Sequence, residues 1–323
     1  MYDVIVIGAG PCGLSVAIEC KKRGLTPLVI EKGCLANSIY HFPLYMEFFS
    51  TPEMIEIGGM PFTTWGRKPG RTEALKYYLS VARRYQLDIH TFEKVIQIKR
   101  GSGQFVVSTQ WRDEHRSYVA AHVVVATGYY DSPKQMKIPG ESLSKVYHYF
   151  REAHPFTGLE VTVIGGRNSA IDAALELQQV GANVTMVYRR SAFTSSVKAW
   201  IRPIIESAIS KGQIKMLWDT EVERISMDEV EVCQAGERIS LKNDVVFAMT
   251  GYKPQLQLLQ GVGAAIDAET GAPVLNEETM ESTIPGLYVA GVIVGGDDTS
   301  RIFIENGRFH GEKIAAHIST KQD

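Results

Sequence analysis

A glycine-rich turn near the N-terminus has the residue types and spacing of a dinucleotide-binding site. Gly8-x-Gly10-x-x-Gly13 follows an apolar, β-branched run and opens a helical pattern. The three glycines allow a tight turn, a close approach of the backbone to a pyrophosphate, and close packing of the helix on the strand. The phosphates then lie at the helix N-terminus, where free N–H groups and the helix dipole favour an anion.

A carboxylate completes this first site. Glu31 ends the next expected strand, about 20 residues after the turn, where an acidic side chain binds ribose hydroxyls. A carboxylate at this place accepts an adenosine with a free 2′-hydroxyl and repels a 2′-phosphate. The first site is therefore expected to bind FAD or NAD rather than NADP.

A second glycine turn lies far downstream, and basic residues follow it where the first turn is followed by the acidic Glu31. Gly165-Gly166-Arg167-Asn168-Ser169-Ala170 has Arg167 in the place of the second glycine and Ala170 as the packing residue. The next expected strand ends in Tyr188-Arg189-Arg190 instead of an acid. Because guanidinium groups bind phosphate in a fork, the arginine pair fits a 2′-phosphate and predicts NADP(H). Two sites of opposite ribose preference indicate a flavoprotein in which NADPH gives a hydride to FAD.

Strands and helices must hold both turns, and the sequence pattern supplies them. Strand, glycine turn, helix and strand follow one another twice, so we expect an α/β protein with two Rossmann-like dinucleotide-binding domains. The expected strands are 4–7, 27–31, 104–108, 118–125, 161–164, 183–188, 229–233 and 239–246, and further helices are expected at 73–85 and 200–210. The Pro-, Phe- and Thr-rich stretch 35–70 is expected to be a long loop that wraps a cofactor.

Composition excludes several classes of function. The chain has 323 residues, and 34 Lys and Arg against 36 Asp and Glu give a net charge of −2, which leaves no basic footprint for nucleic acid. No apolar run approaches the roughly 20 residues that cross a bilayer, and no signal peptide is expected. Four cysteines are too few for a disulfide-stapled secreted fold, and neither they nor the eight histidines have metal-site spacing. We expect a cytoplasmic, two-domain enzyme with free thiols, no metal and a homo-oligomeric state.

Further motifs add a family resemblance over nearly the whole chain. With Ala126-Thr127-Gly128 and Thr250-Gly251-Tyr252-Lys253-Pro254, the two turns resemble those of two-dinucleotide-domain flavoproteins of the thioredoxin reductase type. The resemblance implies a three-layer ββα architecture in each domain and an NADPH domain, 131–251, inserted into a discontinuous FAD domain, 1–130 and 252–323. The stretch 286–291 resembles the second FAD motif of that group. Val292 stands where the group usually has an Asp that holds the ribityl chain.

The cysteines separate this chain from thioredoxin reductases. The chain contains no Cys-x-x-Cys pair. Cys12 and Cys20 lie on one expected helix, about 12 Å apart along its axis, so they do not bridge. A dithiol relay to thioredoxin is therefore not expected.

A narrower resemblance remains. The stretches 8–14, 37–40 (Asn-Ser-Ile-Tyr), 48–51 (Phe-Phe-Ser-Thr) and 303–311 (Phe-Ile-Glu-Asn-Gly-Arg-Phe-His-Gly) resemble the bacillithiol disulfide reductase family. The resemblance implies an FAD-containing, NADPH-dependent reductase of bacillithiol disulfide, the oxidised form of a low-molecular-weight thiol, with Cys12 as the proposed redox cysteine. Cys12 is interpreted as an attacking thiolate. The alternative interpretation is that Cys12 has no chemical role and is a small residue that fits the turn.

The expected site residues fall into two sets. The residues expected to bind FAD are Gly8, Gly10, Pro11, Gly13, Glu31, Lys32, Ser38, Thr127, Gly128, Gly291, Val292 and Phe303. Those expected to bind NADPH are Gly165, Gly166, Asn168, Ser169, Ala170, Arg189 and Arg190. We expect the segment from Phe303 to open the last helix toward the flavin, where a helix N-terminus stabilises negative charge.

Two other functions fit the same motifs. A ferredoxin- or flavodoxin-NADP reductase of the same type has this fold and needs no cysteine. A flavin-binding redox sensor without turnover belongs to another class. NADPH oxidation measured with different electron acceptors distinguishes all three.

Overall fold

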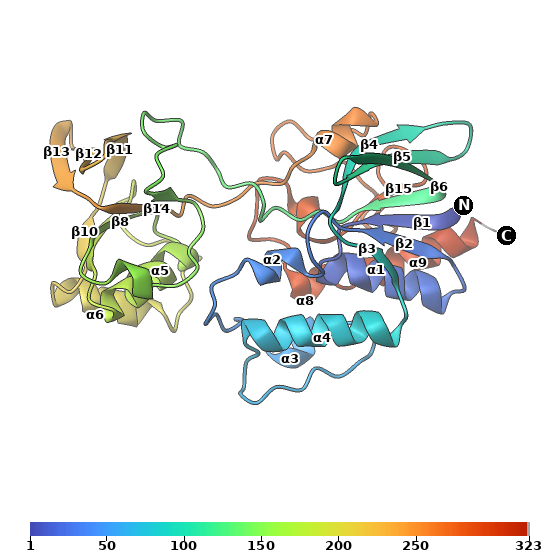
Figure 1. Ribbon diagram of the computed structural model, residues 1–323, viewed down its shortest axis with the longest axis horizontal. Coiled ribbons are helices and arrows are strands. Elements are labelled where there is room, and N and C mark those ends of the chain that lie inside the picture. The colour runs from blue at the N-terminus through green and yellow to red at the C-terminus, as the bar shows by residue number, and fades with distance from the viewer. Residues whose placement is uncertain (322–323) are drawn as a thin grey trace. The chain divides into compact units, whose positions relative to one another are not determined.

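A computed structural model describes residues 1–321. The chain forms two compact units, one made of Met1–Ser132 with the described residues from Tyr252 onward, and one made of Pro133–Gly251. Both units are α/β, with a central sheet that contains parallel strands (Figure 1). The chain thus enters the first unit, passes through the whole second unit, and returns.

The first unit is built on a seven-stranded mixed sheet. Its path runs β3-β2-β1-β6-β5-β4, and β15 also pairs with β6. The strands are β1 (Tyr2–Ile7), β2 (Pro27–Ile30), β3 (Asp88–His90), β4 (Glu93–Arg100), β5 (Phe105–Trp111), β6 (Glu114–Val125) and β15 (Leu287–Val289). The long strand β6 pairs antiparallel with β5 through its first half and parallel with β15 through its last three residues. Strand β4 was not expected from the sequence.

Alternating residues of β1 face two different layers. Val4 and Val6 pack in one core with the helices α1 (Pro11–Lys22), α4 (Arg71–Arg84) and α9 (His310–Thr320). Ile5 and Ile7 pack in another core with β4, β5 and the short helix α7 (Gln257–Gly261). The helices α1, α4 and α9 thus pack on one face of β1, and the β4–β5 end of the sheet with α7 packs on the other, which is the three-layer arrangement expected for this domain (Figure 1).

The stretch 35–70 is mostly irregular, as expected, but it contains two one-turn helices, α2 (Asn37–Tyr40) and α3 (Pro52–Ile55). It is tied to the following helix at several points. The buried Arg71 donates from Nε to the Tyr40 carbonyl at 3.2 Å, and the Tyr77 hydroxyl donates to the Met60 carbonyl at 2.7 Å. The stretch therefore packs against α4 with specific hydrogen bonds.

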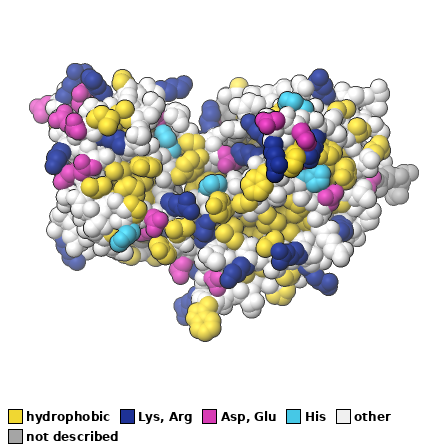
Figure 2. Space-filling model, viewed as in Figure 1, with side chains coloured by type: hydrophobic (Ala, Val, Ile, Leu, Met, Phe, Trp, Pro, Cys, Tyr) yellow, Lys and Arg dark blue, Asp and Glu magenta, His cyan; other side chains and the backbone are white. Residues whose placement is uncertain are grey.

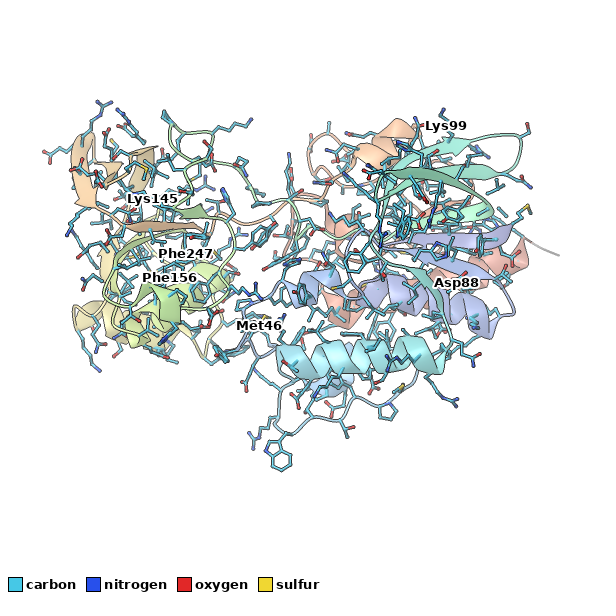
Figure 3. The ribbon with its side chains drawn as sticks, in the orientation of Figure 1. Met46, Asp88, Lys99, Lys145, Phe156 and Phe247 are labelled. Carbon is cyan, nitrogen blue, oxygen red and sulfur yellow. The ribbon has the colours of Figure 1, made fainter. Side chains whose placement is uncertain are left out.

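The second unit has a parallel sheet in the order β10-β9-β8-β14-β7. Its strands are β7 (Val146–Tyr147), β8 (Glu160–Ile164), β9 (Asn183–Val187), β10 (Lys215–Leu217) and β14 (Val245–Ala248), and its helices are α5 (Asn168–Gln179) and α6 (Arg202–Ser210). Phe247 and Phe156 pack edge to face with their ring centroids 5.1 Å apart (Figure 3). This contact packs Phe156 against the part of the core that lies beside β14.

The expected strand 239–246 is wrong, because the chain changes sheet at Asn243. Strands β11 (Thr220–Ile225), β12 (Glu229–Gln234) and β13 (Glu237–Lys242) form a separate antiparallel sheet, whereas β14 joins the parallel one. The buried Asn243 amide donates to Thr162 Oγ1 at 3.0 Å and to the Val245 carbonyl at 2.7 Å. Lys145 Nζ donates to the Asn243 carbonyl at 3.0 Å. Where the chain crosses between the two sheets, the carbonyls of Asn243 and Val245 are therefore paired with side-chain donors. In a continuous strand, neighbouring strands would pair these groups.

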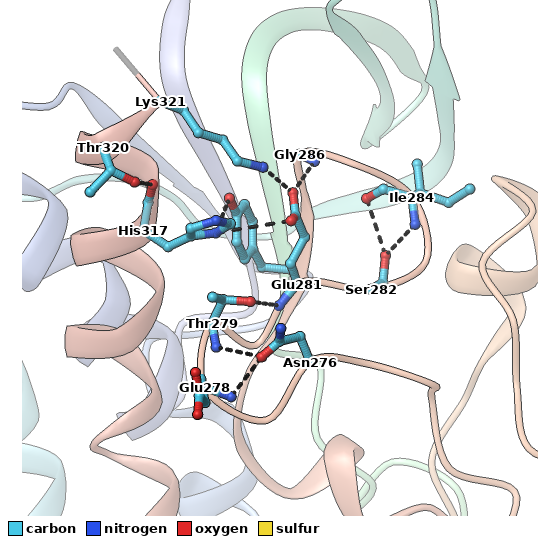
Figure 4. A network of polar contacts seen from close by, with 11 residues as sticks. Asn276, Glu278, Thr279, Glu281, Ser282, Ile284, Gly286, His317, Thr320 and Lys321 are labelled. Carbon is cyan, nitrogen blue, oxygen red and sulfur yellow. Dashed lines mark hydrogen bonds and ion pairs between the residues drawn. The ribbon is translucent and has the colours of Figure 1, made fainter. Parts of the chain in front are cut away.

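The C-terminal helix of the first unit is anchored by a carboxylate. Glu281 accepts the Gly286 N–H at 2.7 Å and the Lys321 ammonium at 2.5 Å (Figure 4). The Tyr288 hydroxyl lies 3.1 Å from Nδ1 of His317 on α9. Polar contacts as well as packing therefore hold the helix α9 against the strand β15 and the segment that precedes it.

Charged side chains of both signs are interspersed on the face seen in Figure 2. This distribution agrees with the near-neutral net charge. Within residues 1–321, no helix is both long and apolar enough to span a membrane.

Candidate functional site

The first glycine turn is closed on two sides and open on the third. Gly8 has φ +111°, and a Cβ atom there would lie 2.5 Å from the Ala126 carbonyl oxygen. A Cβ at Gly13 would lie 2.0 Å from the Gly8 carbonyl oxygen, so the helix approaches the turn as closely as glycine allows. A Cβ at Gly10 would meet nothing within 4 Å. Gly10 therefore leaves open space in front of the N-terminus of α1, where Pro11 takes a first-turn position.

Glu31 lies directly behind this turn. Its side chain is 7% exposed, and its two oxygens accept the N–H groups of Ala9 at 2.9 Å and Gly33 at 2.8 Å. Burial raises the pKa of the carboxyl, and the two N–H donors partly oppose that rise. Since each carboxylate oxygen has two lone pairs, Glu31 retains acceptor capacity for hydroxyl groups of a ligand.

An open pocket adjoins Glu31. It has a volume of about 600 Å³ and is lined by Lys32, Gly33, Cys34, Asn37, Tyr40, His41 and Phe92. Lys32 at its edge also forms an ion pair of 2.9 Å with Asp131. The aromatic and amide side chains around this space suit a flat heterocycle with a few polar atoms. Ser38, on α2, is half-buried beside these residues in the chain.

A buried hydroxyl beside the turn lacks a partner. Among the described residues, Thr127 Oγ1 is fully buried and makes no hydrogen bond. The next residue, Gly128, has φ +71°, and a Cβ there would lie 3.8 Å from Val292 Cγ2. Because buried hydroxyls are normally paired, the orphaned Thr127 hydroxyl is what a site built around a polar ligand is expected to show.

The C-terminal motif places Gly291 against Cys12 and His310. Gly291 has φ +77° and opens the 3-10 helix η2 (Gly291–Gly295). Its N–H donates to Nδ1 of His310 at 3.1 Å. The sequence analysis did not identify His310 as a site residue, and no local pattern indicates a hydrogen bond between residues 19 positions apart.

The segment from Phe303 does not open the last helix, which corrects that expectation. Phe303 is the N-cap of a separate one-turn helix, α8 (Ile304–Gly307), and α9 begins only at His310. The Phe303 N–H donates to Asn306 Oδ1 at 2.8 Å, and this bond caps α8. The segment of α8 and Arg308 contacts residues 50–56, which include α3: Ser50 donates to Glu305, and Arg308 donates to the Glu53 carbonyl at 2.9 Å.

Cys12 is buried and is 8% exposed. A Cβ at Gly307 would lie 2.9 Å from its Sγ, and one at Gly291 would lie 3.1 Å from the same atom. Burial raises the pKa of the Cys12 thiol to about 12. In this conformation the thiol is therefore protonated at neutral pH and packed against two glycines.

The other thiols are not part of the turn. Cys20 is buried on α1, and burial raises the pKa of its thiol to about 12 as well. Cys34 lines the pocket and contacts Asn37 Oδ1 at 3.6 Å, and Cys233 lies on β12. Each of the four cysteines is a free thiol. No group of three His, Cys, Asp or Glu side chains that could hold a metal ion occurs in the described part of the chain.

The second glycine turn is as closely packed as the first. Gly165 has φ +138°, and a Cβ there would lie 2.5 Å from the Met249 carbonyl oxygen. A Cβ at Gly166 would lie 2.5 Å from the Tyr188 ring. Ala170 is buried, whereas Ser169 is exposed in the first turn of α5. The turn thus presents the start of a twelve-residue helix to a ligand.

Basic side chains follow this second turn. Arg189 and Arg190 are both exposed, directly after β9. Asn168, expected as a nucleotide ligand, is engaged elsewhere: its Nδ2 donates to the Ser196 carbonyl at 3.0 Å, and its Oδ1 accepts the Lys198 N–H at 2.9 Å. The structure therefore gives the Asn168 side chain a role in holding the loop that follows the arginine pair.

The residues present fit two dinucleotides. In the first unit, the open space before Gly10, the orphaned Thr127 hydroxyl and the pocket beside Glu31 together suit FAD. In the second unit, a glycine turn, a helix N-terminus and two exposed guanidinium groups suit a phosphorylated dinucleotide.

Comparisons with known proteins agree with this arrangement. Residues 5–291 match the family described as pyridine nucleotide-disulphide oxidoreductase. The chain is 48% identical over 322 residues, 99% of this chain and 98% of the relative, to a protein of Bacillus subtilis named bacilliredoxin reductase Bdr. A solved structure titled bacillithiol disulfide reductase Bdr from Bacillus cereus is 46% identical, with 99% of each chain covered and a TM-score of 0.98. The structure of the same title from Staphylococcus aureus is 42% identical, covers 100% of this chain and 99% of that one, and has a TM-score of 0.96.

Proposed function

The chain belongs to the pyridine nucleotide-disulphide oxidoreductase family, within the group of Bdr reductases, and we propose that it uses FAD and NADPH to reduce bacillithiol disulfide. The observation that carries this proposal is the joining of two dinucleotide cradles in one chain that has no Cys-x-x-Cys pair. The full-length likeness to proteins named as reductases of bacillithiol disulfide supports the same substrate class.

The first unit is proposed to bind FAD. The N-terminus of α1 receives the pyrophosphate in the open space before Gly10. Glu31 accepts ribose hydroxyls, and the pocket lined by Lys32, Tyr40 and Phe92 receives the adenine. Thr127 offers its unpaired hydroxyl, and Gly128, Gly291 and Val292 shape the opposite wall.

The second unit is proposed to bind NADPH. Gly165, Gly166 and Ala170 form the turn that receives the pyrophosphate, next to the exposed Ser169 at the start of α5. Arg189 and Arg190 bind the 2′-phosphate with charge-assisted hydrogen bonds. Asn168 acts here through the loop 196–198, which it holds beside the arginine pair.

Bound together, these groups supply a hydride from NADPH and an electron pair that reaches a disulfide through the flavin. The overall balance is one NADPH, one proton and one bacillithiol disulfide to NADP⁺ and two bacillithiol thiols. The role of the chain is to hold both dinucleotides, to select the 2′-phosphate, and to admit the disulfide.

Cys12 is proposed as the thiol that attacks the disulfide. A bond forms between its sulfur and one bacillithiol while the other bacillithiol leaves as a thiol, and the electron pair from NADPH, delivered through FAD, would then break this mixed disulfide to release the second bacillithiol and free Cys12. Attack requires a thiolate, and the burial of Cys12 against Gly291 and Gly307 disfavours that form. The proposal therefore demands that the segment carrying Gly307 move away from the sulfur during turnover. If Cys12 has no chemical role, the sulfur only fills the space between the two glycines.

Steady-state NADPH oxidation by the purified, FAD-loaded protein tests the function. Three acceptors are compared: bacillithiol disulfide, a bacilliredoxin carrying a mixed disulfide with bacillithiol, and a ferredoxin. We expect bacillithiol disulfide to accelerate NADPH consumption most. The name of the Bacillus subtilis relative makes the bacilliredoxin the second candidate, and faster turnover with it would assign a protein substrate.

Two results would contradict the proposal. Far better turnover with ferredoxin would make the chain a ferredoxin-NADP reductase. No acceleration by any acceptor, in a protein whose flavin NADPH reduces, would favour a sensor without turnover.

A further inference from the structure

A buried backbone N–H at the second FAD motif depends on a histidine. Strand β15 ends where the Ala290 N–H donates to the Val125 carbonyl at 3.0 Å. At the next residue the φ of +77° turns the chain out of the sheet, so the Gly291 N–H loses its strand partner. A buried N–H that loses its ladder partner needs another acceptor. Nδ1 of His310 fills that role at 3.1 Å.

The imidazole is in the form that this bond requires. His310 is 8% exposed, and burial, with a smaller effect of Lys313, lowers its pKa to about 4. The ring is therefore neutral at neutral pH, and because Nδ1 accepts, the ring proton resides on Nε2.

The histidine stands on a rigid support. The next residue, Gly311, approaches α1 so closely that a Cβ there would lie 2.8 Å from the Ser15 backbone. Ser15 Oγ also donates to the Arg308 carbonyl at 2.6 Å. Helix α1 begins at the first glycine turn. Because the segment that carries His310 packs on α1, the bond from Gly291 to His310 holds Gly291 in place relative to that turn.

The turn that His310 holds contacts both other parts of the proposed FAD site. A Cβ at Gly291 would lie 2.9 Å from Cys12 Cβ, and Val292 packs on Gly128 beside the orphaned Thr127 hydroxyl. Val292 has no polar side-chain atom to offer a ligand. The backbone at 291–292, rather than a side chain, must therefore be set in place for a cofactor to fit.

We propose that His310 is a positioning residue for FAD, which fixes the Gly291–Val292 turn through the acceptor atom Nδ1. This inference rests on the FAD assignment of the proposed function but not on its substrate. Without the acceptor, the buried Gly291 N–H must turn to find another partner, and the turn then leaves the position that the cofactor requires.

The test measures the dissociation constant of FAD by fluorescence titration of the full-length apoprotein, together with the visible spectrum of the bound flavin. His310→Asn keeps an acceptor near the place of Nδ1, whereas His310→Leu removes it. His115→Leu is the control for loss of a histidine, because His115 is exposed on β6 in the same unit. We expect His310→Leu to raise the dissociation constant about tenfold or more and to shift the flavin bands, since a buried donor is left unpaired. His310→Asn and His115→Leu should stay within about twofold of the wild type, because neither leaves the Gly291 N–H without an acceptor.

Two outcomes would overturn the inference. A dissociation constant for His310→Leu within about twofold of the wild type rules out positioning, and a lowered melting temperature alone then marks a structural residue. Equal defects in His310→Leu and His310→Asn show that ring shape rather than the acceptor matters. If His310→Leu does not fold, His310→Gln replaces it, since its amide lies near Nε2 instead of Nδ1 and must also weaken FAD binding. Failure of the wild-type protein to bind FAD would instead refute the proposed function.

Discussion

The Sγ atom of Cys12 lies against Gly307, 2.9 Å from where a Cβ of that residue would stand. The two residues belong to opposite ends of the chain, and their contact encloses the sulfur. Gly307 is the last residue of α8. Glu305 of α8 and Arg308, which directly follows it, form hydrogen bonds with residues 50–56, a segment that includes α3. The Cys12 thiol is therefore covered on one side by a short segment that has its own hydrogen bonds.

Replacing Cys12 with Ala tests the thiol directly. Alanine fits the same helix position and should leave FAD binding and flavin reduction by NADPH intact. If Cys12 attacks the disulfide, turnover of bacillithiol disulfide should fall by more than about tenfold, because no other thiolate takes its place. With the thiol pKa raised to about 12, the disulfide step of the wild type should also accelerate steadily between pH 7 and 9. Full turnover in Cys12→Ala would leave the sulfur with a packing role only.

Replacing Arg189 and Arg190 with Ala tests the choice of nucleotide. Each lost charge-assisted bond to a phosphate is worth about 1.5–3 kcal/mol, so the apparent KM for NADPH should rise about tenfold or more per side chain. The KM for NADH should hardly change. Arg238→Ala is the control, since Arg238 is exposed and pairs with Glu223 on the separate antiparallel sheet. Equal use of NADPH and NADH by the wild type would contradict the assignment of the 2′-phosphate site.

Gly10→Ala separates folding from cofactor binding. A Cβ at Gly10 meets nothing within 4 Å and the residue has φ −74°, so the apoprotein should fold with unchanged stability. The methyl group nevertheless occupies the space proposed for the pyrophosphate, and the dissociation constant of FAD should rise about tenfold or more. Gly261→Ala is a matched control at another open glycine. The flavin released by boiling the wild type should chromatograph as FAD, and release of FMN would refute the site.

Asp172 makes stability depend on pH in the second unit. Burial, and to a smaller extent Glu176, raise the pKa of Asp172 from 3.8 to about 7. Between these values the folded protein holds a proton that the unfolded chain has released, so the free energy of unfolding falls as pH rises. At about 1.4 kcal/mol per pH unit, the penalty at pH 8 is on the order of 4 kcal/mol.

Asp172→Asn should therefore raise the melting temperature at pH 8 and leave it nearly unchanged at pH 4. Glu206→Gln, at an exposed position on α6, should raise it at neither pH. A melting temperature of Asp172→Asn equal to that of the wild type at pH 8 would show that the carboxylate is solvated.

The sequence by itself determined the two glycine turns, and it predicts opposite ribose preferences for them. Gly8, Gly10 and Gly13 lie within one strand–turn–helix unit, and Glu31 directly follows the next strand, β2, so local periodicity and spacing suffice to place them. The same holds for the turn at Gly165 and for the two arginines after β9. These features are local because a cradle is made by consecutive backbone groups.

Tertiary structure decided what surrounds those cradles. The contact of Cys12 with Gly307, the bond from Gly291 to His310 and the contact of Ser50 with Glu305, 255 positions apart, join segments that no spacing rule connects. The change of sheet at Asn243 likewise depends on Thr162 and Lys145, which lie far away in the chain. Burial, thiol acidity and the partner of an N–H group are set by the packing of distant segments, and packing is a property of the whole fold.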